Sequence, residues 1–236
     1  MAHEPLEQPL FSVIIPSAGR RPRGLAQALG SVQAALKHSG LAPGQVEVLV
    51  GFDACDGARP QSALERLRYF VLPRPAGGTC GFGNHIRHIL MKQAAGRHLL
   101  FLDDDNALTP QAFTHYLPHL EAELIIASID TSRAFAEAPL LPRPAPPGAD
   151  AATDAVRQGN IDPLCLCVAR ELAFVRCGGW QDEGGYESDF VNIRKYFRRA
   201  RTVVRIAGVV GVYDAGRGLD PQGLNPRQQK LDVEER

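Results

Sequence analysis

The stretch HLLFLDDDN, residues 98–106, decides how the rest of the chain is interpreted. Its first five residues have the length and the mainly apolar composition of a buried strand. Three consecutive aspartates and an asparagine follow directly. In an open α/β sheet, ligands bind beyond the carboxyl ends of the strands, so this triplet is expected at a ligand-binding edge. A solvated loop or a helix N-cap is the alternative interpretation of the triplet taken alone.

The segments around this stretch alternate between strand-like and helix-like patterns. Gly40 and Gly96 follow apolar residues at helical spacing and are expected to end two helices, and Pro110 is expected to open another. An alternation of strands and helices predicts a largely parallel, twisted sheet with helices on both faces. The expected strands are 11–15, 46–52, 69–72, 98–102 and 124–129, and the expected helices are 25–36, 61–67 and 86–94.

The pattern changes after residue 130. Residues 134–158 include five prolines between positions 139 and 147 and are expected to form a long loop. The segments expected after it are an ordered stretch at 164–168, a helix at 187–199, a strand at 203–212 and a loose, polar end of about two dozen residues. A chain of 236 residues can be built around one core, so we predict a single α/β domain.

Composition excludes several classes of protein. The 26 Lys and Arg residues balance the 26 Asp and Glu residues, so no net field would attract nucleic acid. No stretch approaches 18 consecutive apolar residues, and the first ten residues lack the apolar core of a signal peptide. Five cysteines without a CxxC pair favour a reducing compartment, and Cys165 and Cys167 are expected in the core. These features predict a cytoplasmic protein without an integral membrane segment.

Polar and charged residues gather at other strand ends too. The turn PSAGR, 16–20, follows the first expected strand, and Asp53 follows the second. Carboxylates this close repel one another unless a cation sits among them. Mg²⁺ usually binds one or two carboxylates together with substrate phosphates. The sequence therefore predicts a site for a divalent metal, Mn²⁺ or Mg²⁺, that a diphosphate completes.

Four motifs and a later segment carry a resemblance to a known family. They are VIIPS (13–17), VGFD (50–53), a glycine-rich run from 77 that ends in GNHIR (83–87), FLDDDN (101–106), and GGW followed by GYESDF (178–190). Together they resemble glycosyltransferase family 2, in its soluble bacterial type, which has the GT-A fold. The resemblance implies one glycosyltransferase domain, 1–236, with a nucleotide-sugar-binding half at 11–130, an acceptor-side half at 131–213 and a polar tail at 214–236.

The resemblance also implies a role for individual residues. The residues expected to contact the nucleotide are Pro16, Ser17, Arg20, Asp53, Asn84, Arg87 and Asp104. The turn after Pro16 and the Asp53 carboxylate would hold the base, and Asp104 would reach the ribose. Asn84 and Arg87 open a helix near the phosphates, where a helix N-terminus and an arginine suit an anion.

Metal binding and catalysis are assigned in the same way. Asp103 and Asp105 would bracket the metal, with Asp105 as its direct ligand. Asp189 would be the general base that deprotonates the acceptor hydroxyl. The family's usual Glu-Asp pair is Glu-Ser-Asp here, which leaves the base open between Glu187 and Asp189.

Other departures bear on the nucleotide and the metal. The usual Asp-Asp-Gly-Ser is FDAC at 52–55, and the usual Arg-Asn pair is replaced by Gly83-Asn84 with Arg87 one turn later. No histidine follows His119, so the C-terminal metal-binding histidine of some relatives is absent. The resemblance then implies a weakly held metal, bound mainly by Asp105 and the donor diphosphate.

The implied reaction moves a hexosyl group from a nucleoside-diphosphate sugar, expected to be UDP-linked, to a hydroxyl of a saccharide or lipid-linked saccharide, with inversion.

Three rival functions remain. An NAD-dependent oxidoreductase is suggested by Gly81-Phe82-Gly83 and Asp103, although Ile86 stands at the third glycine position. A sugar-1-phosphate nucleotidyltransferase is suggested by the loop at 17–21, which lacks a following lysine. An inactive binding module of the same fold is the third.

Overall fold

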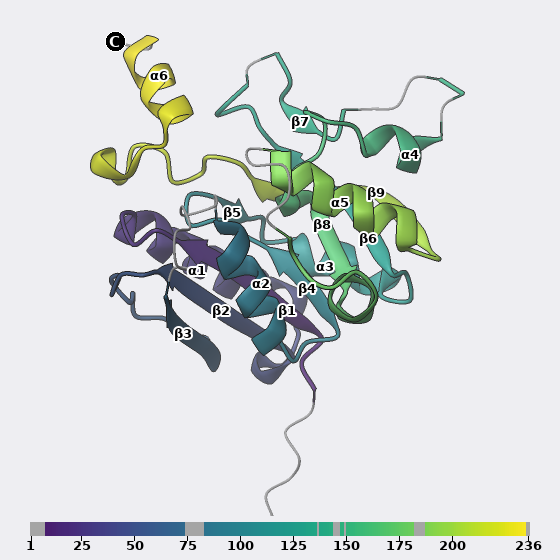
Figure 1. Ribbon diagram of the computed structural model, residues 1–236, viewed down its shortest axis with the longest axis horizontal. Coiled ribbons are helices and arrows are strands. Elements are labelled where there is room, and N and C mark those ends of the chain that lie inside the picture. Colours follow the sequence, from purple (N-terminus) through teal and green to yellow (C-terminus); the bar gives the residue numbers. More distant parts are fainter. Residues whose placement is uncertain are drawn as a thin grey trace, which may run out of the picture.

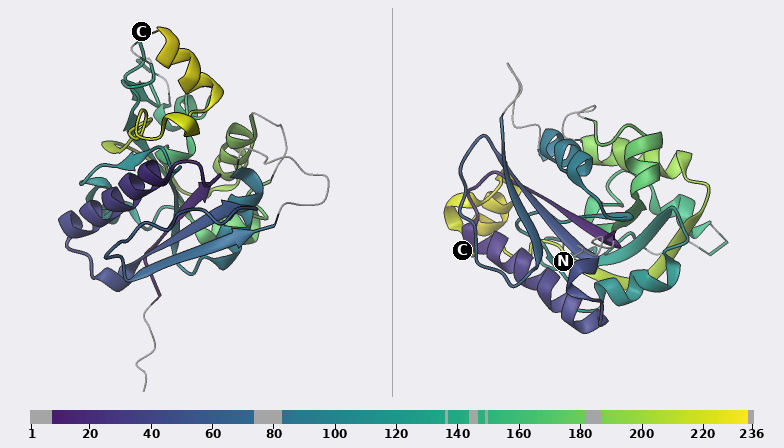
Figure 2. Two further views of the ribbon diagram at one scale, coloured as in Figure 1. Left: turned by 90° about the vertical axis from the view of Figure 1, so that its left-hand side faces the viewer. Right: turned by 90° about the horizontal axis from the view of Figure 1, so that it is seen from below.

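One mixed sheet organises the part of the chain that the computed structural model describes, residues 8–73, 83–135, 137–143, 147–148, 150–181 and 187–234. The strand order is β3-β2-β1-β4-β8-β6-β9-β5, and β7 pairs with β6 outside this path (Figure 1). Figure 2 shows α1 and α3 on one side of the sheet and α2 and α5 on the other. This arrangement confirms the predicted single α/β domain.

The first half of the sheet is parallel. Its strands are β1 (Phe11–Ser17), β2 (Val46–Asp53), β3 (Arg66–Leu72) and β4 (His98–Phe101). Every residue of β1 and β2 is buried, because helices cover both faces of a parallel sheet. The carboxyl ends of these strands therefore meet at one edge, as the sequence predicts.

Two helices pack against this half. In α1 (Pro22–Ser39), Leu25, Leu29 and Val32 are buried at helical spacing, Pro22 occupies the first turn, and Gly40 ends the helix with a φ of 70°. The second helix, α2 (Asn84–Gln93), buries Ile86 and Leu90. Both helices follow the strand-to-helix alternation read from the sequence.

The second half of the sheet is mixed. Its elements are β5 (Ala107–Leu108), α3 (Ala112–Tyr116), β6 (Leu124–Asp130), β7 (Leu140–Leu141), α4 (Ala151–Ala155), β8 (Leu166–Ala169), α5 (Ser188–Arg199), β9 (Val203–Val212) and α6 (Pro226–Glu234). Short helical turns are η1 (Pro43–Gln45), η3 (Leu117–His119), η4 (Pro163–Cys165), the π-helix η5 (Glu171–Arg176) and η7 (Pro221–Gly223). Strand β8 is antiparallel to β4 and β6, and β9 is parallel to β6, so β9 runs in the direction of β4.

Several sequence-based expectations need correction. The helix expected at 61–67 is absent: β3 starts at Arg66, because seven residues there pair with the open edge of β2. The helix before Gly96 ends at Gln93, and Gly96 instead lies against β1, where its amide donates to Ser12 Oγ at 2.8 Å. Helix α3 begins at Ala112, two residues after Pro110.

The long loop and the tail also differ from expectation. The described part of 134–158 contains β7 and α4. The described part of the C-terminal segment is not loose, because it forms η7 and α6 and contacts the sheet edge through hydrogen bonds described below. Cys165 and Cys167 are buried as predicted. None of the helices in the described part of the chain is long and apolar enough to cross a membrane.

Candidate active site

The loops after β1 and β4 are joined by hydrogen bonds to Asp104. The Ser17 hydroxyl donates to Asp104 Oδ2 at 2.6 Å, and Arg21 Nη1 donates to Oδ1 at 2.8 Å. Burial raises the pKa of Asp104, while Arg21 and Ser17 oppose this by favouring the charged form. The polar segments that follow β1 and β4, both of which the sequence predicts at this edge, are therefore brought together. The arginine that joins them is Arg21, whereas the predicted Arg20 has an exposed side chain.

A second group of side chains surrounds Asp105. Its Oδ2 lies 3.1 Å from Arg21 Nη1 and accepts a hydrogen bond from Gln228 Nε2 at 2.8 Å. The same Gln228 nitrogen donates to Asp214 Oδ1, also at 2.8 Å. The pKa of Asp105 is raised to about 6: burial is the largest cause, Arg21 opposes the rise, and the charges of neighbouring aspartates add to it. Two carboxylates from different strand ends thus share one neutral amide.

Asp214 is a member of this edge that the sequence interpretation missed. It follows β9, whose carboxyl end lies at the same edge as that of β4. Both its carboxylate oxygens lie 2.7 Å from Arg227 Nη2, and its backbone N–H donates to Asn106 Oδ1. The strand-end rule, by which ligands bind beyond the carboxyl ends of the strands, singled out Asp53. It would also have found Asp214, because the strand at 203–212 was predicted.

Arg87 connects the two halves of the domain. Its side chain is only 2% exposed, its Nη2 lies 2.5 Å from Asp103 Oδ1, and its Nη1 lies 3.7 Å from Asp189 Oδ1. The guanidinium also lies over the ring of Trp180, 5.2 Å from the centroid. Burial lowers the pKa of Arg87, but the two aspartates outweigh this effect and raise it above its usual value. One buried cation therefore joins the predicted metal-binding and catalytic segments.

Asp189 and Glu187 occupy different surroundings at the start of α5. Asp189 faces Arg87 and keeps 40% of its side-chain surface exposed. Neighbouring atoms that displace water raise the pKa of Asp189, and Arg87 opposes the rise. The exposed Glu187 accepts a hydrogen bond from Gln158 instead. Residues 182–186, which precede this pair, lie outside the described part of the chain.

Asp162 is a second acidic residue that sequence reasoning missed. Its Oδ1 accepts from the backbone N–H of Leu164 at 2.9 Å, at the start of η4. Burial raises the pKa of Asp162 to about 8, the charges of Asp103 and Asp189 add to the rise, and Arg87 opposes it. Its place before β8 is informative only once that strand is known to be antiparallel, which the sequence pattern did not predict.

The remaining residues predicted to contact the nucleotide are Pro16, Asp53 and Asn84, and all three are buried. Asp53 ends β2 and is buried, and Pro16 packs against Gly83. The buried Asn84 accepts a hydrogen bond from the indole of Trp180 at 2.7 Å. Trp180 is itself buried, so it anchors the core rather than offering an exposed face for a sugar. The part of the glycine-rich motif at 77–82 lies outside the described residues.

The chemistry of this edge suits a divalent cation that is only partly held by protein. Within the described residues, no group of three or more His, Cys, Asp or Glu side chains is placed to hold a metal ion. Asp105 offers a carboxylate oxygen, which hard cations prefer, with the ion-paired Asp214 beside it, and one or two carboxylates are what Mg²⁺ commonly takes from a protein. The residues present therefore fit a cation whose other ligands come from a diphosphate and water.

Comparison with known proteins bears on the fold. No protein-family model and no curated protein matches the sequence. Among solved structures, residues 1–349 of S. aureus TarS match with a TM-score of 0.64 and 16% identity, over 86% of this chain and 59% of that one. The same TarS fragment in complex with UDP-GlcNAc matches with a TM-score of 0.60 and 14% identity, over 86% and 58% of the two chains.

The fold is GT-A-like. This confirms the fold class predicted from the sequence, and at such low identity the similarity shows the fold alone. The chain spans about three fifths of the length of the TarS fragment that it matches.

Proposed function

We propose that the protein is a glycosyltransferase that moves a sugar from a nucleoside-diphosphate sugar to an acceptor hydroxyl. The observation that carries the proposal is that the buried Arg87 contacts both Asp103 and Asp189 at the carboxyl edge of a GT-A-like sheet. This contact joins the aspartate triplet after β4 to the acidic first turn of α5. The TarS fragment, which shares the fold, binds UDP-GlcNAc, which favours a UDP-linked donor.

On the donor side, residues at this edge would contact the nucleotide and the metal. Asp53 at the end of β2 and the turn after Pro16 would hold the base, and Asp104 would reach the ribose. Asp104 is already oriented by Ser17 and Arg21, so it would need little rearrangement. Asp105, with Asp214 beside it, would hold Mn²⁺ or Mg²⁺, and that ion would supply Lewis-acid stabilisation of the departing diphosphate.

On the acceptor side, Asp189 is the favoured general base. The acceptor oxygen would attack the anomeric carbon while the bond from that carbon to the diphosphate oxygen breaks. Asp189 would take the hydroxyl proton, a role that typically contributes about 10²–10⁴-fold in rate. Its side chain keeps 40% of its surface exposed, and its raised pKa makes the carboxylate a stronger proton acceptor. Direct displacement by one nucleophile inverts the anomeric configuration.

A nucleotide panel tests the donor assignment by thermal unfolding. A ligand that binds only the folded protein stabilises it by RT ln(1 + [L]/Kd) and so raises its melting temperature. UDP with Mn²⁺ should stabilise the protein clearly more than UDP with a chelator. Stabilisation by NAD alone would support the oxidoreductase instead. Stabilisation by a nucleoside triphosphate together with a sugar 1-phosphate, without an effect of UDP, would support the nucleotidyltransferase.

A further inference from the structure

Gln228 is a polar residue that the surrounding protein almost completely encloses. It lies on α6 and is only 1% exposed. Its Oε1 accepts from the Asn225 N–H at 3.0 Å and from Arg21 Nη2 at 3.4 Å. Its Nε2 donates to Asp105 and to Asp214, each at 2.8 Å. Both halves of the amide are therefore used, and both N–H donors point at carboxylates.

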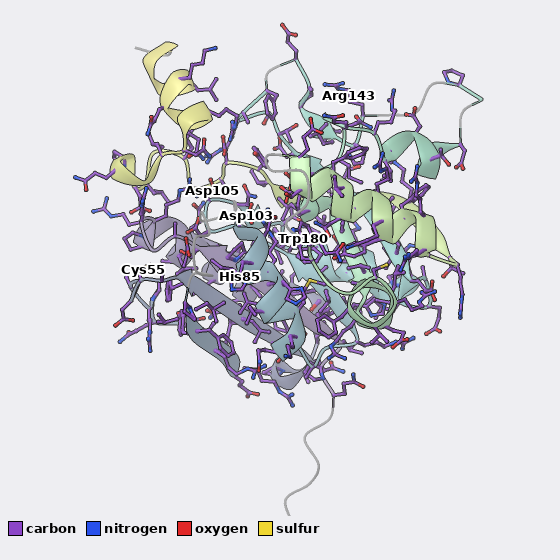
Figure 3. The ribbon with its side chains drawn as sticks, viewed as in Figure 1. Cys55, His85, Asp103, Asp105, Arg143 and Trp180 are labelled. Atoms are coloured by element: carbon purple, nitrogen blue, oxygen red, sulfur yellow. The ribbon has the colours of Figure 1, made fainter. Side chains whose placement is uncertain are left out.

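The segment around Gln228 is anchored to the sheet edge at independent points. Arg227 forms its ion pair with Asp214 and lies over the rings of Phe135 and Tyr213. Asp220 accepts from the Gly24 N–H at 2.7 Å, at the start of α1. Figure 3 shows Asp105 next to this C-terminal segment. The position of Gln228 is thus set by contacts other than its own.

The geometry at Asp105 indicates what the amide does. Its Oδ2 contacts both Arg21 and Gln228, whereas its Oδ1 accepts no hydrogen bond from the described residues. A carboxylate held through one oxygen presents the other in a defined direction. Gln228 also holds Asp214 beside Asp105, although the charges of the two carboxylates repel. Because the amide is neutral, it orients both groups without adding a positive charge that would repel a cation.

We propose that Gln228 is a positioning residue for the cation site at Asp105, and that the C-terminal segment 214–231 is thereby a working part of the donor site. This inference rests on the proposed function. Groups that hydrogen-bond to metal ligands orient them, and their loss typically weakens metal affinity by about 10–100-fold. No family motif that we identified in the sequence extends to this segment.

The test measures Mn²⁺ affinity in the presence of saturating UDP, by the electron paramagnetic resonance signal of free Mn²⁺. Gln228→Leu replaces the side chain with an apolar one of similar size and removes both N–H donors. We expect its Kd for Mn²⁺ to rise by about 10-fold or more. The matched control is Gln229→Leu, one residue along the helix at an exposed position, where Kd should stay within about twofold.

Melting temperatures without metal separate positioning from a purely structural role. If Gln228→Leu lowers stability but binds Mn²⁺ like the parent, the inference is overturned. Should Gln228→Leu fail to fold, Gln228→Asn replaces it, because the shorter amide cannot reach both carboxylates and should weaken Mn²⁺ binding in the same direction. Unchanged affinity in that variant overturns the inference as well. If the parent protein binds neither UDP nor Mn²⁺, the proposed function falls first and this inference with it.

Discussion

At the scale of single residues, two arginines form ion pairs with the acidic residues of the candidate site. Arg21 contacts Asp104 and Asp105, and Arg87 contacts Asp103 and lies near Asp189. Each acidic residue therefore has a partner already, and its substitution has two effects. One effect is on the ligand that the carboxylate would bind, and the other is on the arginine that loses a partner. Pairs of variants are needed to separate them.

The first pair concerns the metal. Asp105→Asn should weaken Mn²⁺-dependent UDP binding by about 10-fold or more, since the amide is a poorer ligand for a hard cation. Asp103→Asn should weaken it less but should cost more stability, because the buried Arg87 then loses its 2.5 Å partner. Titration calorimetry and thermal unfolding measure the two quantities. Full Mn²⁺-dependent affinity in Asp105→Asn would show that the metal is assigned to the wrong residue.

The second pair concerns the base. Asp189→Asn keeps the shape of the side chain but removes the proton acceptor, so donor Kd should stay within a few-fold while transfer falls by about 10²-fold or more. Glu187→Gln should leave transfer nearly unchanged, because Glu187 contacts Gln158 rather than Arg87. Steady-state rates and donor binding are measured on both variants. If Glu187→Gln alone abolishes transfer, the base is Glu187.

Asp162 should make stability depend on pH. Its pKa rises from the ordinary 3.8 to about 8 in the folded protein, so the folded state binds this proton more strongly than the unfolded state. The associated stabilisation is present below about pH 4 and is lost as the pH rises through about 8. Asp162→Asn does not titrate, so urea unfolding of this variant should lose less stability between pH 5 and pH 8 than the parent. Parallel losses in the two proteins would contradict the assignment.

At the scale of elements, local sequence predicted most of the regular structure. The strand at 203–212 and the helix at 187–199 are found as expected, because the first is a mainly apolar, valine-rich run and the second has apolar residues at helical spacing. The errors have a common cause in tertiary contacts. Arg66 and Leu67, at the end of the helix predicted over 61–67, instead belong to β3 and pair with β2. The polar C-terminal segment is ordered because Arg227 and Gln228 find buried partners. Neither partner is visible in a window of local sequence.

A pair of glycines tests this reliance on tertiary contacts. A Cβ at Gly96 would lie 2.5 Å from Ser12 Oγ and 2.6 Å from the Ser12 nitrogen, so Gly96→Ala should destabilise the protein by about 1–3 kcal/mol. Gly30 lies in α1 with nothing within 4 Å of the same position, so Gly30→Ala should stabilise it by about 0.5–1 kcal/mol. Denaturant unfolding measures both. Equal effects would mean that Gly96 is not held against β1.

At the scale of the whole molecule, the two halves differ in how far the sequence could predict the site. The parallel half places Asp53 and Asp103–Asp105 at one edge, as the strand-end rule requires. The second half contains the antiparallel β8, whose amino end brings Asp162 toward that edge. Strand direction depends on long-range pairing, so residues such as Asp162 and Gln228 could be recognised only in the folded domain.

The most direct test of the proposed function is the release of UDP from UDP-sugars. The protein is incubated with Mn²⁺, a panel of UDP-hexoses and UDP-N-acetylhexosamines, and simple saccharide acceptors, and free UDP is quantified over time. We predict release from at least one donor, abolished by a chelator and reduced about 10²-fold or more in Asp189→Asn. If UDP binds in a Mn²⁺-dependent manner but no UDP-sugar in the panel is cleaved above the rate in buffer, the protein is a nucleotide-binding module of this fold rather than a transferase.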